Sequence, residues 1–399
     1  MARTREHHRA VVRRGVAVAA AALILTASGM YRTPVRAATI IRVPEDYRSV
    51  QAAIDAASAG DVVSLAAGRY FVNVTLDVGI TLRGRSYSAD DPRQNTTILD
   101  GRGATVVTIP SDVTPAPAVV GLVIANGDDG VAIRSPARVM HSSFVGGVSD
   151  LIDYELGGGG LALNNVFVGS GDDAIDIDHL TRDVRLLHND IRRSGDDGIE
   201  IRLHDEVIPK TADVLIRGNS IAGSDEDGIQ VIDYYTQTNR RIFIKRNLIR
   251  DSVMAGIGLM DNAETVEDYR GASILEPIHV FHNMLVRNDH GISGGGRLIA
   301  VNNILQGHVL ALKNVNGESV AAFNLLWNND VGARNSTVRW TTGVYRAPLL
   351  GADYQLQAGS PAIDAGIARF WWNGEVVLDT LASAYDGAAP DLGWSEHGQ

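Results

Sequence analysis

The feature that most constrains the fold of this chain is an internal repeat. A single Asn followed by a short apolar strand recurs at intervals of 24, 30, 28, 36, 20 and 21 residues. The repeated residues are Asn165, Asn189, Asn219, Asn247, Asn283, Asn303 and Asn324. An acidic turn recurs in phase with them, with copies that start at Asp128, Ser149, Asp172, Asp196 and Glu226. Two markers that share one period indicate a solenoid of stacked coils.

Each repeat has room for three short strands and shows no helical period. Ile242–Ile244 precedes the Asn, Leu248–Ile249 follows it, and Ile229–Val231 follows the acidic turn. Strands this short bury their apolar side chains only when successive coils stack. The chain is therefore predicted to be all-β, a parallel β-helix with three strands per coil and about 4.8 Å between coils. The repeated Asn side chains are expected to form an internal ladder, in which each amide bonds the next.

The two ends of the chain depart from the repeat. The apolar spacing at Tyr47, Val50, Ile54 and Ala57 predicts a short amphipathic helix that caps the N-terminal end of the solenoid. After about Asn335 the repeat is lost. The predicted organisation is a targeting segment (1–37), an N-terminal strand and capping helix (38–60), the β-helix (61–335) and an irregular C-terminal cap (336–399).

The first 37 residues have the pattern of a secretory signal peptide. Five Arg precede the apolar run Val16–Ala27, and Val35–Ala37 offers a cleavage site of small residues. The run is too short for a comfortable membrane span, and an uncleaved anchor is the alternative. Arg13–Arg14 also suits twin-arginine export. We expect cleavage near Ala37 and a secreted or periplasmic mature chain with no membrane span.

Charge and composition exclude several kinds of function. The chain has no Cys, which excludes a disulfide scaffold, a thiolate metal site and a Cys nucleophile. The formal net charge is −11, although the targeting segment is rich in Arg. Nucleic acid is not expected as a partner, because phosphate binding needs Lys and Arg. An acidic polymer would bind only with a cation between the two. Capped solenoid ends predict a monomer.

Segments at both ends resemble those of known secreted proteins. The opening segments are Ile41–Tyr47, Ile54–Ala57, Gly60–Val63 and Gly68–Tyr70, and the closing segments are Gly359–Gly366 and Pro390–Gly393. They resemble the pectin-lyase-like superfamily of right-handed parallel β-helix proteins, which includes polysaccharide lyases, polygalacturonases and NosD-like proteins. The resemblance implies a right-handed coil and a carbohydrate-active protein, although one such fold hosts many activities. Asp289–Ser293 also resembles a polygalacturonase motif, but its order along the chain differs.

The acidic turns place one carboxylate at the same position in successive coils. Carboxylates about 4.8 Å apart repel by about 3.5 kcal/mol at an effective dielectric constant of about 20. Raised pKa values, hydrogen bonds to turn amides or a bound cation would relieve this repulsion. Ca²⁺ suits oxygen ligands from several carboxylates, and a purely structural turn role is the alternative. The candidate metal ligands are Asp150, Asp173, Asp197 and Asp227.

The strand after each acidic turn alternates, so every second side chain points outward. Ile175 and Ile177 are expected to point inward, which places Asp176 and Asp178 on the external face. Candidate catalytic residues on this face are Asp176, Glu200, Arg202 and His204. Candidate substrate-binding residues are Asp153, Asp178, Gln230, Tyr234 and Lys245. Insertions at 204–212, 234–240 and 261–277 are expected to build a wall beside the face.

The leading functional hypothesis is a secreted carbohydrate-active enzyme that acts on a polysaccharide along the external groove. A glycoside hydrolase needs two carboxyl groups about 5 Å or about 6.5 to 9.5 Å apart, which Asp176, Glu200 and Asp153 could supply. A polysaccharide lyase would use Ca²⁺ to neutralise a uronate and a basic residue to remove its proton. The candidates for that base are Arg202, His204 and Lys245.

The alternative hypothesis is a protein without catalytic activity. An adhesin, a cell-envelope glycan binder or a NosD-like accessory protein would use the same groove but needs no acid–base pair. Replacing Asp176 and Glu200 by their amides would separate the two hypotheses, because only an enzyme would lose turnover and keep binding.

Overall fold

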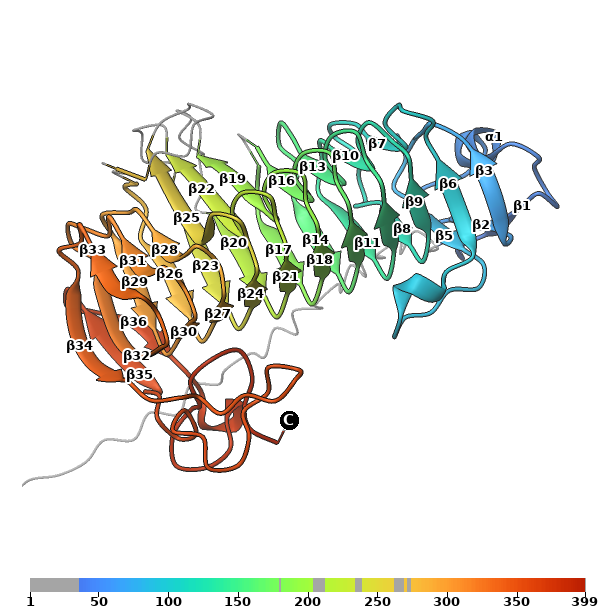
Figure 1. The fold of residues 1–399 in the computed structure, drawn as a ribbon. Helices are drawn as coiled ribbons and strands as arrows, with labels where there is room; N and C mark the ends of the chain where they lie inside the picture. Colours follow the sequence, from blue (N-terminus) through green and yellow to red (C-terminus); the bar gives the residue numbers. More distant parts are fainter. Residues whose placement is uncertain are drawn as a thin grey trace, which may run out of the picture. The chain divides into compact units, whose positions relative to one another are not determined.

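Successive coils of the chain stack because each strand pairs in parallel with the equivalent strand of the next coil. A computed structural model describes residues 36–178, 181–203, 212–233, 239–261, 269–270 and 274–398. Residues 38–399 form one unit. Figure 1 shows that its strands form long parallel sheets along the solenoid. The predicted parallel β-helix with three strands per coil is confirmed.

Three rows of strands, here called faces 1, 2 and 3, make up the solenoid. Face 1, before the Asn turn, contains β1 (Ile40–Val43), β2 (Val62–Leu65), β5 (Thr81–Gly84), β8 (Ala118–Val120), β11 (Ala137–Met140), β14 (Gly160–Leu163), β17 (Val184–Leu187), β20 (Ala212–Arg217), β23 (Arg240–Lys245), β26 (Ile278–Phe281), β29 (Leu298–Val301), β32 (Val320–Trp327) and β34 (Arg339–Val344). Face 2, after the Asn turn, contains β3 (Gly68–Phe71), β6 (Thr97–Asp100), β9 (Val123–Ala125), β12 (Ser143–Val145), β15 (Val166–Val168), β18 (Asp190–Arg192), β21 (Ser220–Ala222), β24 (Leu248–Arg250), β27 (Met284–Val286) and β30 (Ile304–Gln306). Face 3, after the acidic turn, contains β4 (Val74–Thr75), β7 (Val107–Ile109), β10 (Val131–Ile133), β13 (Ile152–Tyr154), β16 (Ile175–Ile177), β19 (Glu200–Leu203), β22 (Ile229–Asp233), β25 (Ala255–Asp261), β28 (His290–Ser293), β31 (Leu310–Lys313) and β33 (Val331–Arg334).

Alternation within each short strand builds the core. In β17, Val184 and Leu186 are fully buried, whereas Arg185 between them is exposed. Successive side chains of a strand point to opposite faces, so the inward residues of all three rows meet in the interior. They form one apolar cluster that extends from Ile41 to Val338.

A ladder of buried Asn side chains fixes the turn between faces 1 and 2. Both the backbone N–H and the side-chain amide of Asn219 donate to Oδ1 of Asn247, each over 3.0 Å. Asn247 makes the same two bonds to Asn283 in the next coil. The pattern continues from Asn165 to Asn324, and the predicted ladder is confirmed.

The N-terminal helix lies within the first coil rather than before it. Helix α1 (Val50–Asp55) begins after Ser49, whose hydroxyl caps it, and buries Val50 and Ile54. It contacts β1, β2 and β4. Because β1 already pairs with β2, parallel pairing starts at Ile40. A short 3₁₀-helix, η1 (Pro92–Gln94), interrupts the connection between β5 and β6.

The C-terminal segment packs against the sides of the last coils. Parallel pairing continues to Val344, beyond the last repeated Asn. An antiparallel hairpin, β35 (Arg369–Trp372) and β36 (Glu375–Asp379), and the 3₁₀-helix η2 (Ala382–Ala384) follow. Leu392 packs against the exterior of face 2, and Leu378 packs against the exterior of face 1. In the described part of the chain, no helix is long and apolar enough to cross a membrane.

Candidate functional site

Two columns of side chains run along the outside of face 3. Strand pairing places one residue of each coil in register, and these residues form what is here called the face column. Its members are Asp153, Asp176, Glu200, Gln230, Gly258, Ser293, Lys313 and Arg334. The turns before these strands supply a turn column of Asp150, Asp173, Asp197, Asp227 and, two coils later, His290. The face column is acidic at its N-terminal end and basic at its C-terminal end.

One oxygen of each turn Asp has a structural role. Oδ1 of Asp150, Asp173 and Asp197 accepts the backbone N–H of the equivalent residue in the next coil, over 2.7 to 3.0 Å. Asp227 accepts the N–H of Ala255 over 2.6 Å in the same way. The expected turn role is therefore present. It leaves the second oxygen of each carboxylate available for another interaction.

Two of the turn aspartates form a buried cluster of carboxylates with one residue of the face column. Asp173, Asp197 and Glu200 are all buried, and each offers an oxygen within 4.8 Å of the others. Among the residues that the structure describes, Oδ2 of Asp197, Oδ2 of Asp227 and Oδ1 of Asp176 are buried without a hydrogen-bond partner. A buried charge without a partner is costly. These oxygens therefore need either protons or a cation.

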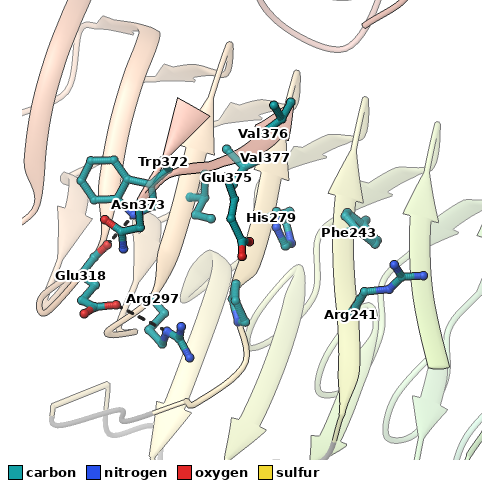
Figure 2. A pocket seen from close by; sticks show the side chains of 12 residues that line it. Arg241, Phe243, His279, Arg297, Glu318, Trp372, Asn373, Glu375, Val376 and Val377 are labelled. Carbon is teal, nitrogen blue, oxygen red and sulfur yellow. Dashed lines mark hydrogen bonds and ion pairs between the residues drawn. The ribbon is translucent and has the colours of Figure 1, made fainter. Parts of the chain in front are cut away.

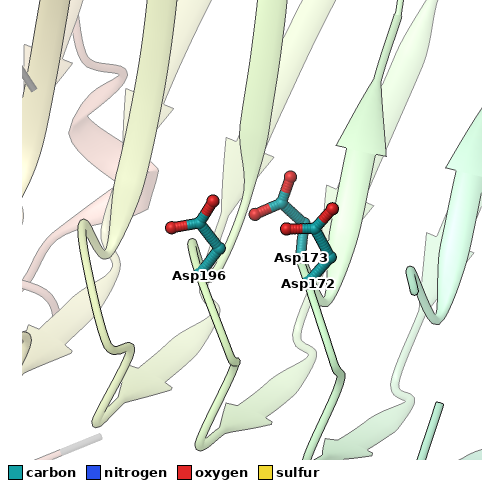
Figure 3. A group of neighbouring side chains, drawn as sticks. All are labelled: Asp172, Asp173 and Asp196. Atoms are coloured by element: carbon teal, nitrogen blue, oxygen red, sulfur yellow. The ribbon is translucent and has the colours of Figure 1, made fainter. Parts of the chain in front are cut away.

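Two further acidic groups adjoin this cluster at the surface. Asp172, Asp173 and Asp196 form one of them, with ligand oxygens within 4.8 Å of one another. Figure 3 shows their carboxylates converging from two adjacent turns. Asp196, Asp197 and Glu226 form the other group. The donor set consists of carboxylate oxygens alone, which suits hard cations such as Ca²⁺.

Burial and mutual repulsion raise the pKa values of these carboxyl groups. Burial raises the pKa of Asp150 to about 7 and that of Asp153 to about 8, and neighbouring carboxylates add to both shifts. The pKa of Asp173 and that of Asp197 lie well above the ordinary value for the same two reasons. Burial also raises the pKa of Asp227 to about 7, although a hydrogen bond from Tyr269 opposes the shift. Without a cation, the cluster holds protons near neutral pH.

Glu200 differs from Asp176 because it has a cationic partner. Nε of Arg202 contacts Oε1 of Glu200, and Nη2 donates to Oε2 over 3.1 Å. Arg202 thus opposes the rise in pKa that burial imposes on Glu200. The pKa of Asp176 is raised well above its ordinary value, chiefly by burial and then by Glu200. Asp178 lies next to Arg202 on the same face.

The structure does not bring all predicted site residues together. Lys245 lies on β23 of face 1, with Nζ 4.6 Å from the ring centre of Phe243, and does not reach face 3. His204 and Tyr234 lie outside the described residues, as does most of each predicted insertion. The strands that precede the insertions, β19, β22 and β25, are direct neighbours in face 3.

A cluster at the basic end of face 3 was missed by the sequence interpretation. Nζ of Lys313 lies 3.3 Å from Nε2 of His290 and 5.5 Å from the ring centre of Tyr269. The Tyr269 hydroxyl donates to Asp227 over 2.6 Å, which links this cluster to the acidic columns. This contact needs a glycine at position 258, because a Cβ there would lie 1.7 Å from Oδ2 of Asp227 and 2.8 Å from the Tyr269 ring. Extending the register of the acidic turns would have found His290, whereas Tyr269 lies in an insertion without a repeat signal.

No protein-family model matches the chain, and neither does any curated protein sequence. Among solved structures, the chain is similar to the PL6 family alginate lyase AlyGC (14% identity, 82% of this chain and 56% of that chain, TM-score 0.44). It is also similar to pectate lyase Pel9A (14%, 88% and 91%, 0.38) and to the A-module of the Azotobacter vinelandii mannuronan C-5 epimerase AlgE6 (13%, 75% and 94%, 0.38). The chain spans little more than half of AlyGC.

These likenesses concern the fold alone. The strand pairing itself shows that the chain is a parallel β-helix, and the resemblance seen in its sequence is confirmed at the level of the fold. Face 3 adds a feature of this particular chain, a column of outward residues that changes from acidic to basic along the solenoid.

Proposed function

We propose that the chain is a Ca²⁺-dependent enzyme that cleaves an anionic polysaccharide along face 3, by β-elimination at a uronate. The observation that carries this proposal is the buried trio Asp173, Asp197 and Glu200, with oxygens within 4.8 Å of one another. Three carboxylates this close in a buried site need a compensating charge. Asp150 and Asp227 would extend the ligand set along the turn column. When bound, the cation would neutralise the substrate carboxylate and make the neighbouring C–H more acidic.

The charge change along the face column supports an anionic substrate. A polymer over the acidic coils would contact the metal-binding residues, and further along it would reach Lys313 and Arg334. Coils repeat about every 4.8 Å, so consecutive sugars would meet consecutive coils. Asp153, Asp178 and Gln230 would contact the sugar hydroxyls beside the cleaved bond.

The reaction needs one proton removed and one supplied. A base takes the proton beside the uronate carboxylate, a C=C bond forms, the glycosidic C–O bond breaks, and the leaving oxygen is protonated. Arg202 is the candidate base on this face, and His204, which lies outside the described residues, is the second candidate, since Lys245 lies on face 1. Asp176, whose pKa burial raises well above its ordinary value, would protonate the leaving oxygen.

The test follows two signals at once. Residues 38–399 are incubated with uronic and neutral polysaccharides, with Ca²⁺ or with a chelator. New reducing ends and ultraviolet absorbance from an unsaturated sugar are expected to rise together on a uronic polymer and to vanish with chelator. Glu200→Gln is expected to lower turnover by at least about 100-fold, whereas Asp330→Asn, at an exposed carboxylate before β33, leaves turnover unchanged. No signal on a broad panel would contradict an enzyme and leave face 3 as a glycan-binding surface.

Glycoside hydrolysis is a second candidate, favoured by the pairing of Asp176 with Glu200. Their strands are in register, so the carboxyl groups stand about one coil, ~4.8 Å, apart. Retaining glycosidases hold their two carboxyl groups about 5 Å apart. Arg202 opposes the rise in the pKa of Glu200, whereas burial and Glu200 together raise the pKa of Asp176, and such enzymes need two carboxyl groups with different pKa values. Reducing ends that rise without ultraviolet absorbance, and that survive the chelator, would establish this reaction instead.

We further propose that the chain is exported and processed near Ala37, and that the mature protein is a monomer. The Arg-rich and apolar pattern of the first 37 residues supports export. N-terminal sequencing of protein recovered outside the cytoplasm is expected to begin close to Ala38. A mature chain that retains its first 37 residues would contradict cleavage. Light scattering of residues 38–399 is expected to give the mass of one chain.

A further inference from the structure

A pocket lies on face 1, on a different side of the coil from the acidic columns. It has a volume of about 360 Å³ and is bounded by β23, β26 and β29 on one side and by the C-terminal hairpin on the other. Figure 2 shows Glu375 beside His279, with Trp372 and Glu318 toward one end of the pocket and Phe243 and Arg241 toward the other. Pockets of 300 Å³ or more are typical of small-molecule sites.

The hairpin is shaped so that one of two adjacent Trp residues enters this pocket. Asn373 and Gly374 both have positive φ, 48° and 84°, which is the geometry of a tight type I′ turn. Side chains alternate along β35, so Phe370 and Trp372 face the solenoid, whereas Trp371 faces outward. Trp372 consequently lines the pocket and donates its indole N–H to the carbonyl of Glu318 over 3.0 Å. Trp371 is not among the lining residues and is 57% exposed.

The floor of the pocket is a row of apolar and aromatic side chains. Phe243, His279 and Ile299 occupy the same register position in three consecutive coils of face 1. The rings of Phe243 and His279 stack with their centres 4.7 Å apart. Burial lowers the pKa of His279 to about 4, so this floor is uncharged at neutral pH.

The rim of the pocket carries two positively charged and two negatively charged side chains. The rim residues are Arg241, Arg297, Glu318 and Glu375, all of them exposed, and Nε of Arg297 lies 3.8 Å from Oε2 of Glu318. Arg241 is already held by Asp213 over 2.6 and 2.9 Å. Because both arginines already have carboxylate partners, they offer no unpaired charge to an anionic ligand, while the carboxylates can still accept hydrogen bonds. A neutral ligand rich in hydroxyl groups suits such a rim, because each hydroxyl donates and accepts.

We propose that this pocket binds one or two units of a neutral sugar. Its apolar floor and the Trp372 ring suit the C–H face of a pyranose, and the charged rim suits the hydroxyl groups at its edge. The site is separate from face 3 and does not depend on the function proposed for that face. If one glycan occupied both this pocket and face 3, the two sites together would bind it more tightly than either site alone.

The test uses intrinsic Trp fluorescence of residues 38–399 with neutral hexasaccharides as probes, namely cellohexaose, mannohexaose and xylohexaose. At least one is expected to shift the fluorescence in a saturable way, with or without chelator. Trp372→Ala is expected to weaken binding by at least tenfold, whereas Trp371→Ala leaves the affinity unchanged. Glu375→Gln, at an exposed position, is expected to weaken binding by about threefold without a change in melting temperature.

The result that would overturn the proposal is equally specific. No saturable binding of any of the three probes at millimolar concentration, measured by calorimetry, would exclude the site. Equal loss of affinity in the Trp371 and Trp372 variants would place the binding elsewhere. If Trp372→Ala lowers the melting temperature, Glu375→Gln and Arg297→Met decide, and unchanged affinity in both overturns the proposal. Binding of hexagalacturonate alone would also contradict it.

Discussion

Each aspartate of the turn column uses its two oxygens differently. Oδ1 of Asp197 accepts the backbone N–H of Asp227 over 2.7 Å, while Oδ2 is buried without a partner. An Asn at this position keeps the accepting oxygen and removes the charge. The structural and the cation-binding roles of one residue can therefore be separated by a single substitution.

For this reason Asp197→Asn is expected to have opposite effects with and without Ca²⁺. In chelator the melting temperature should rise, because a repelling carboxyl group has been removed. Adding millimolar Ca²⁺ should raise the melting temperature of the variant much less than that of the parent chain, because the variant lacks one carboxylate that binds the ion. Thermal melts monitored by circular dichroism measure both. If Ca²⁺ stabilises neither chain, the cluster is compensated by protons alone.

The raised pKa values predict how stability depends on pH. Asp150, Asp153 and Asp227 have folded pKa values of about 7 to 8, far above the ordinary value. Between pH 6.5 and 8 the folded state therefore binds more protons than the unfolded state, and its stability falls as the pH rises. Buried His282 and His308, with folded pKa values of about 3 and 4, oppose this decline only at its lower end, because an unfolded His with an ordinary pKa of about 6.5 is mostly neutral above about pH 7.

The expected measurement is a melting temperature that declines from pH 6.5 to pH 8 in chelator. Saturating Ca²⁺ should flatten this decline, because the bound state already holds ionised carboxylates. Asp153→Asn, which removes the highest of the three titrations, should make the decline shallower. A melting temperature that rises over this range in chelator would show that the carboxyl groups are ionised even without a bound cation.

Within the repeated elements, the Asn ladder carries the turn between faces 1 and 2. Asn247 accepts two hydrogen bonds from Asn219, donates two to Asn283 and donates one to the carbonyl of Ile216 over 3.0 Å. All of these groups are buried, so the loss of one side chain leaves several polar atoms without partners. Such buried unsatisfied atoms are costly.

Asn247→Ala is therefore expected to lower the free energy of unfolding by about 3 kcal/mol or more. Urea denaturation of residues 38–399 is the measurement. Gln357→Ala removes an amide of similar size from an exposed position and should change stability by less than about 0.5 kcal/mol. Similar effects of both substitutions would mean that the ladder contributes no more than a surface amide.

For the whole molecule, the C-terminal segment matters because it covers the outside of two faces. Leu392 is fully buried against the exterior of face 2, in a cluster with Met284 and Ile304. Arg246 and the buried Glu396 form an ion pair at 2.6 Å beside it. Where the hairpin stops short of β23, the pocket on face 1 opens. Packing of this segment thus decides which parts of the solenoid are accessible.

Leu392→Ala should cost about 2 to 5 kcal/mol of unfolding free energy, as cavities in apolar clusters do. Leu381→Ala, at a side chain that is 72% exposed, provides the control and should cost less than about 0.5 kcal/mol. Urea unfolding followed by Trp fluorescence reports both, because Trp394 packs against the same cluster. An equal, small effect would contradict tight packing of the segment.

The repeat alone determined the architecture, because strand period and turn chemistry are local properties. The spacing of Asn165 to Asn324 predicts stacked coils, and alternation such as that of Ile175, Asp176 and Ile177 predicts which side chains face out. Once coils stack in register, residues 23 to 30 positions apart become neighbours. The acidic columns of face 3 therefore followed from the sequence.

Tertiary structure decided what lies between coils and what covers them. Lys245 was grouped with face 3 from its sequence position, but its strand precedes an Asn turn and belongs to face 1. Tyr269 reaches Asp227 from an insertion whose path no period describes. The hairpin that brings Trp372 onto face 1 comes from outside the repeat. Local pattern specifies the direction of a side chain within its own coil, whereas contacts across loops and segments depend on how the folded chain packs.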